Sequence, residues 1–405
     1  MEQLQVDPQN SLSLIQNKLS ELNALEPEDS QLDAHRQRQA NLIVASFELG
    51  DRVLLSDASK LATDPRLRTY VVHAMHPDRI DLTTFLPLIL EGHEDGAMRN
   101  VALLAAWHHT GVPLSSTLQD RLTQRLREIH RDDPDAESHS VSGLLLRNLG
   151  HEVVADEGDL TKQEFDASRD WYVNDSRQTM VVLRPHCFRV DGYTAPPELS
   201  YDFAISSTEV RLDSFRTFNP DHAQDETYQV TNHNVPAAGV LIFRAAKYCN
   251  WLSRKEGIRE EEWCYPPDSE ITVKNCYPVS GFETKSGYRL PLSFEWEYAC
   301  RAGSTTSRFF GENVRLMNYY GWHKKTSDSL INPVGKLLPN AFGLFDMYGN
   351  VAEPCIENST ANRYVTRGES CFRVADEMDS STTGPADPQG LGRLQGFRVV
   401  RRIED

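Results

Sequence analysis

The sequence predicts a multidomain chain, with an N-terminal all-α helical repeat domain over residues 1–150 and a C-terminal α+β domain over residues 169–405. Two observations support this division. Apolar residues recur at helical spacing in the first part, whereas short β-like runs among many turn residues fill the second. Between them, residues 151–168 are acidic and poor in apolar side chains, which predicts a linker. A chain of 405 residues is long enough to form two ordinary cores.

The N-terminal part shows both helical periodicity and a repeated junction. The apolar spacing of helices occurs in Gln31–Leu49, Leu82–Leu90 and Leu118–Ile129. At Asp64, Asp95 and Asp133, an acidic N-cap residue lies close to Pro or Gly before a possible helix. The intervals of 31 and 38 residues (64 to 95 and 95 to 133) are typical of paired-helix repeats. We therefore expect a short HEAT-like repeat, with a compact helical bundle as the alternative.

Beyond the linker the pattern becomes that of short strands and turns. Trp171–Val173 and Thr179–Leu183 are β-like. Helical spacing returns only at Ala237–Lys255 and Ser293–Ala302. Few helices among many short strands and long loops predict an α+β domain.

Composition limits the partners and the location. The formal net charge of −17 argues against nucleic acid or an anionic membrane as a partner, because phosphate binding needs clustered Lys and Arg. No stretch approaches the roughly 20 apolar residues of a membrane span, and the N-terminus lacks the pattern of a secretory signal. The seven cysteines include no Cys-x-x-Cys pair, which disfavours a zinc cluster and predicts mostly reduced thiols. These features predict a cytoplasmic protein.

The segment Gly343–Glu353 is the most informative part of the chain. Asp346 and Glu353 offer carboxylates, and Gly349 and Asn350 favour a sharp turn that can aim main-chain carbonyls inward. Calcium binds six to eight oxygens of these kinds at roughly 2.3–2.6 Å. The spacing therefore suits a hard cation, and an Asx-type turn with a satisfied acidic pair is the alternative.

Four further segments accompany this one in a fixed order. They are Tyr201–Val210, Ala245–Ser253, Gly287–Gly303 and Gly396–Arg401. Together the five segments resemble the formylglycine-generating enzyme (sulfatase-modifying factor) family over about residues 170–403. The resemblance implies an elaborated C-type-lectin-like fold for the C-terminal domain.

The family's activity is oxidation of a substrate cysteine to formylglycine by two cysteines that bind copper. In the family, these two cysteines follow a motif that usually reads Arg-Gly-Gly-Ser. The matching stretch of this sequence is Arg367–Glu377. Aligning Ser370 with the motif serine puts Arg373 at the first cysteine position and Glu377 at the second. Neither residue supplies the soft thiolate that Cu(I) prefers.

Cys371 is the one weak catalytic candidate in that stretch, since a shift of two residues keeps the same face of a strand. A near-linear copper site needs a second thiolate, and no cysteine follows Cys371. Cys355 is the other nearby candidate. We therefore predict that the chain lacks the oxidase activity, with Cys371 packing as a small hydrophobe.

A second branch of the superfamily binds non-haem iron through histidines on an adjoining helical bundle. The expected His-x-x-x-His-x-Glu pattern is absent. His73 and His76 are three residues apart, and the adjacent His108 and His109 lie on different helix faces. An iron centre is therefore not expected.

The resemblance implies a structural calcium ion. Its ligands would be the side chains of Asp346 and Glu353 and the carbonyls of Gly349 and Val351. The family usually has Trp at two positions that here hold Ala352 and Pro354, so the shape of the groove is expected to differ.

Two arginines in family motifs, Arg289 and Arg398, are expected to lock loops by pairing with carboxylates. Glu209 is a candidate partner.

These observations favour a non-catalytic binding or adaptor protein. A groove around residues 355–395 would bind one protein partner, and the helical domain would bind another. The alternatives are a copper-dependent formylglycine-generating oxidase and a regulatory subunit that docks a separate enzyme through its helical half. The arrangement also resembles part of some large bacterial proteins described as serine/threonine kinases, but no kinase motif occurs in the sequence.

Overall fold

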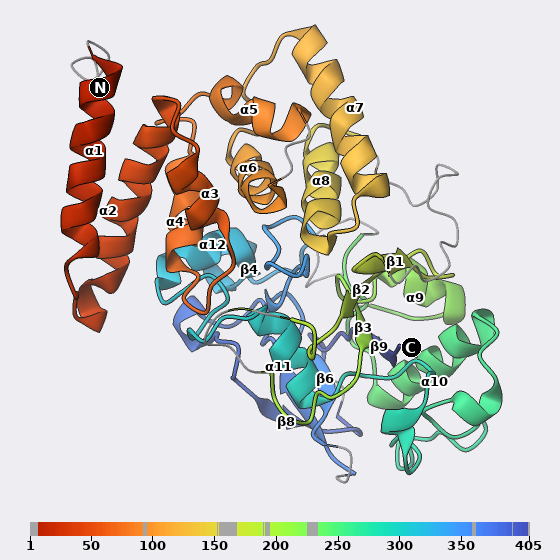
Figure 1. Cartoon of the computed structure of the whole chain (residues 1–405). Coiled ribbons are helices and arrows are strands. Elements are labelled where there is room, and N and C mark those ends of the chain that lie inside the picture. Colours follow the sequence, from red (N-terminus) through yellow and green to blue (C-terminus); the bar gives the residue numbers. More distant parts are fainter. Residues whose placement is uncertain are drawn as a thin grey trace. The chain divides into compact units, whose positions relative to one another are not determined.

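The computed structural model describes residues 7–91, 95–151, 153, 168–188, 190, 195–224, 234–358, 362–390 and 392–403. Figure 1 follows the chain from its N-terminus in red to its C-terminus in blue. The chain divides into two compact units. The helical unit comprises Met1–Asp132, Val141–Glu152 and Gly303–Asn313, and the second unit comprises Asp133–Ser140, Val153–Ala302 and Val314–Asp405. Most of the predicted linker (152 and 154–167) lies outside the described residues.

The N-terminal region forms helices throughout its described residues. They are α1 (Pro8–Asn23), α2 (Asp29–Glu48), α3 (Val53–Ser59), α4 (Arg66–Ala74), α5 (Leu82–Leu90), α6 (Gly96–His108), α7 (Ser116–Asp132) and α8 (Ala136–Asn148). The three helices predicted from apolar spacing are confirmed as α2, α5 and α7. The predicted junctions precede α4, α6 and α8, and the Asp95 carboxylate accepts a hydrogen bond from Met98 N at 3.1 Å to cap α6.

The helical unit is built by packing successive helices against one another. Helix α2 contacts α4, and α4 contacts α6. Helix α1 lies against α2, α3 lies against α2, α4 and α6, and α5 lies against α6 and α7. Phe85 and Ile89 of α5 and Val101 of α6 are fully buried in its core. Burial of such an apolar face supplies most of the stability of helices this short.

Three histidine side chains from two helical segments meet in this unit. The ring of His108, at the end of α6, lies 5.0 Å from that of His73 in α4 and 5.4 Å from that of His76 (centroid to centroid). Burial lowers the pKa of His73 to about 3 and that of His108 to about 4. Both imidazoles are therefore neutral in the folded protein at neutral pH.

The histidine cluster is expected to make the helical unit sensitive to acid. An unfolded histidine takes up a proton near pH 6.5, whereas His73 and His108 resist protonation until about pH 4 or below. Their contribution is therefore fully present above pH 6.5 and is lost as the pH falls, by about 1.4 kcal/mol per pH unit for each histidine. Thermal melts at pH 7.5, 6 and 5 measure this loss. The double variant H73Q/H108Q should show a shallower dependence on pH, and an unchanged slope would contradict the assignment.

The second unit contains a four-stranded antiparallel sheet. Its order is β1 (Trp171–Val173), β2 (Thr179–Leu183), β3 (Phe203–Ser206) and β9 (Val400–Arg402). The strands predicted at Trp171–Val173 and Thr179–Leu183 are thus confirmed. The C-terminal strand pairs with β3 through Ile205 and Val400, so the two ends of the domain share one sheet.

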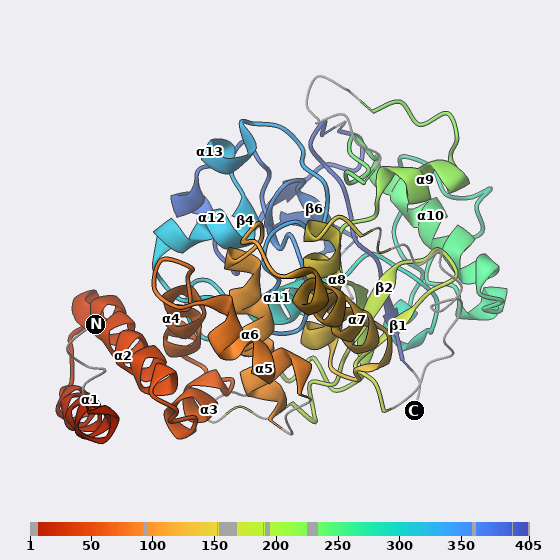
Figure 2. The same ribbon diagram turned by 90° about the horizontal axis from the view of Figure 1, so that it is seen from above.

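Helices and two smaller sheets complete this unit. They are α9 (Leu212–Phe218), α10 (Ile242–Lys255), α11 (Ser293–Arg301), α12 (Met317–Tyr320), α13 (Lys324–Ser327), the parallel pair β4 (Gly321–Trp322) and β5 (Tyr348–Gly349), and the antiparallel set β6 (Glu353–Ile356), β7 (Tyr364–Arg367) and β8 (Gly384–Ala386). Figure 2 shows α9 beside α10, and these two helices are in contact. Tyr248 and Leu252 of α10 pack into the main core with Phe397.

Two details of the helix prediction were wrong. The helix expected from Ala237 begins only at Ile242, because Ala237 N and Val240 N donate to main-chain carbonyls of other segments. The prediction also missed α9, α12 and α13, which have seven, four and four residues. Helices this short do not span enough turns to show a 3.6-residue period.

Candidate functional site

The segment around Asp346 forms a chain of tight turns. Gly343, Asp346, Gly349 and Asn350 all have left-handed backbones, with φ of 76°, 57°, 85° and 56°. Glycine is required at 349, because a Cβ atom there would lie 1.8 Å from the main-chain oxygen of Trp322 in the paired strand β4. The predicted sharp turn is therefore present, and it brings Asp346 into the interior of the domain, where it is 2% exposed.

Glu353 is held in a buried ion pair. Arg398 Nε donates to Glu353 Oε2 at 2.7 Å, and Nη2 donates to Oε1 at 2.8 Å. Trp296 Nε1 donates a further hydrogen bond to Oε2 at 2.8 Å. The remaining donors of Arg398 bond the main-chain oxygens of Ser206 and Phe345. Both oxygens of Glu353 are therefore engaged by protein donors.

Asp346 and Glu209 are less completely satisfied. Asp346 Oδ2 accepts a hydrogen bond from Gly335 N at 2.7 Å. Asp346 Oδ1 and both carboxylate oxygens of Glu209 are buried, and they have no hydrogen-bond partner among the residues that the structure describes. Burial raises the pKa of Asp346 to about 6 and, together with the neighbouring charge of Asp346, raises the pKa of Glu209 well above its usual value.

Arg289 and Arg398 form the expected ion pairs with carboxylates, but their partner is not Glu209. Arg289 Nη1 and Nη2 donate to the two oxygens of Glu295 at 2.6 and 2.7 Å, and Arg398 pairs with Glu353. The suggestion that Glu209 pairs with one of these arginines was wrong. The reason is geometric, since two nitrogens of each guanidinium already donate to the two oxygens of another carboxylate.

An exposed ion-pair network occupies the two positions aligned with the copper-binding cysteines. Arg373 Nε lies 3.0 Å from a carboxylate oxygen of Glu369, and Arg373 Nη1 lies 3.4 Å from one of Glu377. Cys371 is buried in an apolar cluster that includes Val235 and Ile331. Burial raises the pKa of the Cys371 thiol to about 12, so it is protonated at neutral pH.

Cys355 is also buried, in β6, and its thiol lies 3.7 Å from the main-chain oxygen of Glu353. Across the part of the chain that the structure describes, no group of three or more His, Cys, Asp or Glu side chains is placed to hold a metal ion.

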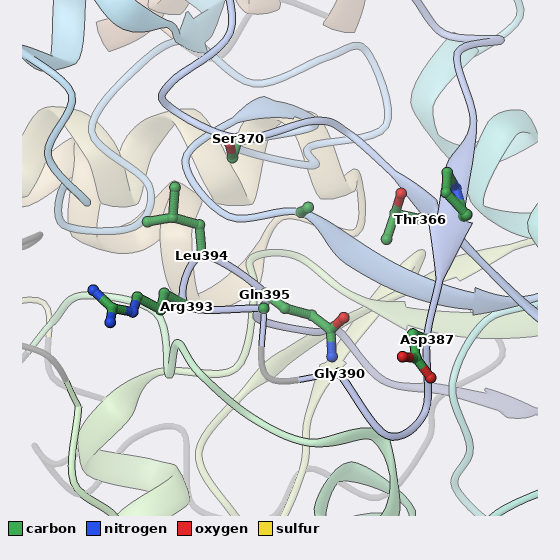
Figure 3. Close-up of a pocket in the computed structure, with 10 residues that line it drawn as sticks. Thr366, Ser370, Asp387, Gly390, Arg393, Leu394 and Gln395 are labelled. Carbon is green, nitrogen blue, oxygen red and sulfur yellow. The ribbon is translucent and has the colours of Figure 1, made fainter.

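A surface pocket of about 480 Å³ lies beside β7 and β8 (Figure 3). It is lined by Ala352, Thr366, Ser370, Pro385, Asp387, Gly390, Gly392, Arg393, Leu394 and Gln395. Apart from Ala352, these residues fall within the predicted groove range of 355–395. In Figure 3, Arg393 points away from the other labelled side chains.

The wall of this pocket is fixed by hydrogen bonds. Ala352 N donates to Leu394 O, and Gly396 N donates to Ala352 O. The Gln395 side chain donates to Val240 O at 2.9 Å and is buried. Ala352 contributes only a methyl group to this wall.

The fold and these motifs define a domain of the formylglycine-generating-enzyme class. A profile of the family described as "Sulfatase-modifying factor enzyme 1-like domain" matches residues 149–403, more than half of the chain. The chain belongs to this family, as its motifs predicted.

Individual relatives cover only parts of the chain. It is 28% identical to chaperone protein LppX of Paenibacillus barcinonensis, over 41% of this chain and 69% of that protein. It is 33% identical to the formylglycine-generating enzyme of Mycobacterium tuberculosis, over 29% of this chain and 45% of the relative. It is 30% identical to serine/threonine-protein kinase pkn1 of Chlamydia pneumoniae, over 31% of this chain and 17% of the kinase. The chain thus spans less than half the length of the last two.

Among solved structures, Treponema denticola variable protein 1 aligns with a TM-score of 0.44 at 22% identity, covering 56% of this chain and 95% of that one. PvdO from Pseudomonas aeruginosa aligns with a TM-score of 0.43 at 21% identity, covering 57% of this chain and 98% of PvdO. Within the described residues, no helix has both the length and the apolar character needed to cross a membrane.

Proposed function

We propose that this chain is a non-catalytic protein-binding adaptor whose C-terminal domain binds a partner at the pocket beside β7 and β8. The main support is the chemistry at the positions aligned with the copper-binding cysteines. An Arg–Glu ion-pair network stands there, and the thiol of Cys371 in the same stretch is buried and protonated. Copper(I) requires soft thiolate ligands, which these side chains do not offer.

The pocket suits a protein ligand. It combines hydrogen-bonding side chains, such as Thr366, Ser370 and Asp387, with the apolar surface of Pro385 and Leu394. Loops held on a rigid scaffold commonly carry binding residues. The similarity to a protein described as a chaperone also supports a protein ligand.

The N-terminal helices supply a second surface in this proposal. We propose that they form a HEAT-like repeat. The support is that α2, α4 and α6 follow one another in contact, and that α1, α3 and α5 each contact the helix that follows, as expected of stacked helix pairs. We further propose that the C-terminal domain has the C-type-lectin-like fold of its family.

Site-specific photocrosslinking in cells tests the binding pocket. A benzophenone amino acid at Asp387 of the full chain should give discrete covalent adducts with a partner. The same amino acid at the exposed Lys274 of the same domain is the matched control and should give none. Adding A352W, which fills the pocket with the side chain typical of the family, should remove the Asp387 adducts. Equal adducts at both positions, or adducts that persist with A352W, would count against the proposal.

A further inference from the structure

We infer that a pocket beside α2 and α4 in the helical unit binds a small phosphate monoester, with Arg79 as the residue that recognises the phosphate. The pocket has a volume of about 290 Å³. Polar side chains from α2, α4 and the turn after α4 line most of it: Gln37, Asn41, Tyr70, His73, His76 and Arg79. The inference does not depend on the proposed function, because the pocket beside β7 and β8 belongs to the other unit.

The first argument is a cation without a counter-charge. The guanidinium of Arg79 lines the pocket, and its Nη1 donates a hydrogen bond to the side-chain oxygen of Asn41 in α2. Among the residues that the structure describes, no carboxylate forms an ion pair with Arg79. A guanidinium carries five N–H donors in a fixed planar fork that matches the oxygens of a phosphate or a carboxylate. The neutral amide of Asn41 orients this fork but does not compensate its charge, so an anionic ligand would complete the site.

The second argument is the local balance of charge and donors. The imidazoles of His73 and His76 and the amide of Gln37 line the same pocket, and each of these groups carries an N–H donor. Asp78 is the one carboxylate among the lining residues, and its side chain is 88% exposed and lies 3.3 Å from His76 Nδ1. Water screens a charge that is this exposed. The pocket therefore favours an anion, although the chain as a whole is acidic.

The arrangement of the donors selects phosphate over carboxylate. A carboxylate presents two oxygens in one plane, whereas the donors come from α2, α4 and the turn after α4. A phosphate monoester presents three terminal oxygens that are strong acceptors, so it can meet donors from all three segments. The volume of about 290 Å³ exceeds what the phosphate group itself needs and leaves room for a small organic group.

A metal ion is the other occupant that a histidine cluster suggests. The rings of His73, His76 and His108 lie close together in this unit. Within the described ranges, however, these side chains are not placed as a group that could hold a metal ion. The anion is therefore the occupant that the geometry supports.

Equilibrium dialysis of the full chain against radiolabelled glycerol 3-phosphate tests this site, with the ionic strength held constant by NaCl. We expect saturable binding of about one molecule per chain. Unlabelled glycerol should not compete, because it lacks the phosphate, and acetate should compete at least about tenfold more weakly than unlabelled glycerol 3-phosphate. R79Q should weaken binding by about tenfold or more, the effect expected when a charge-assisted hydrogen bond is lost. Arg79 is exposed, so this variant should fold, and near-UV circular dichroism checks that it does.

Two further variants sharpen the test. N41D is nearly isosteric and places a carboxylate beside Arg79, so the protein itself would supply the counter-charge and binding should be abolished. R121Q removes an exposed arginine from α7, outside the pocket, and should bind like the parent chain. No binding by the parent chain, or equal binding by the parent, R79Q and N41D, would overturn the inference. Tighter competition by acetate than by glycerol 3-phosphate would overturn the assignment to phosphate.

Discussion

The variant G349A is expected to be among the most destabilising single substitutions in the C-terminal domain. Gly349 has a φ of 85°, and a Cβ atom there would lie 1.8 Å from Trp322 O and 2.5 Å from Trp322 C. These are main-chain atoms of the paired strand β4, so no side-chain rotation relieves the clash. We expect the free energy of unfolding to fall by about 4 kcal/mol or more, which is on the scale of the most destabilising single substitutions. Near-UV circular dichroism and urea denaturation measure the loss.

G281A is the matched control for this prediction. Gly281 also has a left-handed backbone, with a φ of 73°, but no atom of the described residues outside its immediate neighbours lies within 4 Å of the added Cβ. Its cost should therefore be only the conformational one, about 1–2 kcal/mol. If G349A and G281A were equally stable, the close approach of β4 and β5 would be wrong.

The variant R398M is expected to lower the free energy of unfolding by about 3–5 kcal/mol, because it leaves the buried carboxylate of Glu353 without the positive charge of Arg398. The double variant E353Q/R398M should recover part of this loss, since it removes the stranded charge along with the pair. R254M is the control, because its ion pair with Asp268 is exposed and should contribute less than about 1 kcal/mol. Urea denaturation of the four chains measures these differences. Similar losses for R398M and R254M would contradict the assigned role of the buried pair.

Local elements of the fold could be predicted from the sequence, but their pairing could not. The α5 helix has the bounds predicted from its apolar run, and β1 and β2 were found from their β-branched and aromatic residues. The contact between β3 and β9 joins Ile205 to Val400, and no local pattern specifies a partner at that separation. Short helices such as α9 were missed because their formation depends on tertiary packing rather than on periodicity.

The features of the candidate site that lie within one short segment could be predicted from the sequence. The turn around Gly349, with Asp346 facing inward, follows from residues within one short stretch. The pairing of Arg398 with Glu353 joins residues 45 positions apart, and the sequence suggested Glu209 instead. The histidine cluster was missed for the same reason, since His73 and His108 lie on different helices and only the packing of α4 on α6 brings them together.

Copper(I) binding tests the central claim most directly, namely that this family member lacks the metal centre of the oxidases. The full chain would be titrated anaerobically with Cu(I) against a chromophoric competitor, in a C187S background because Cys187 is the exposed cysteine. We predict that the chain retains no tightly bound copper, that C371S changes nothing, and that a cysteine-containing peptide causes no oxygen consumption. One tightly bound copper per chain that is lost in C371S, together with peptide-dependent oxygen consumption, would contradict the account.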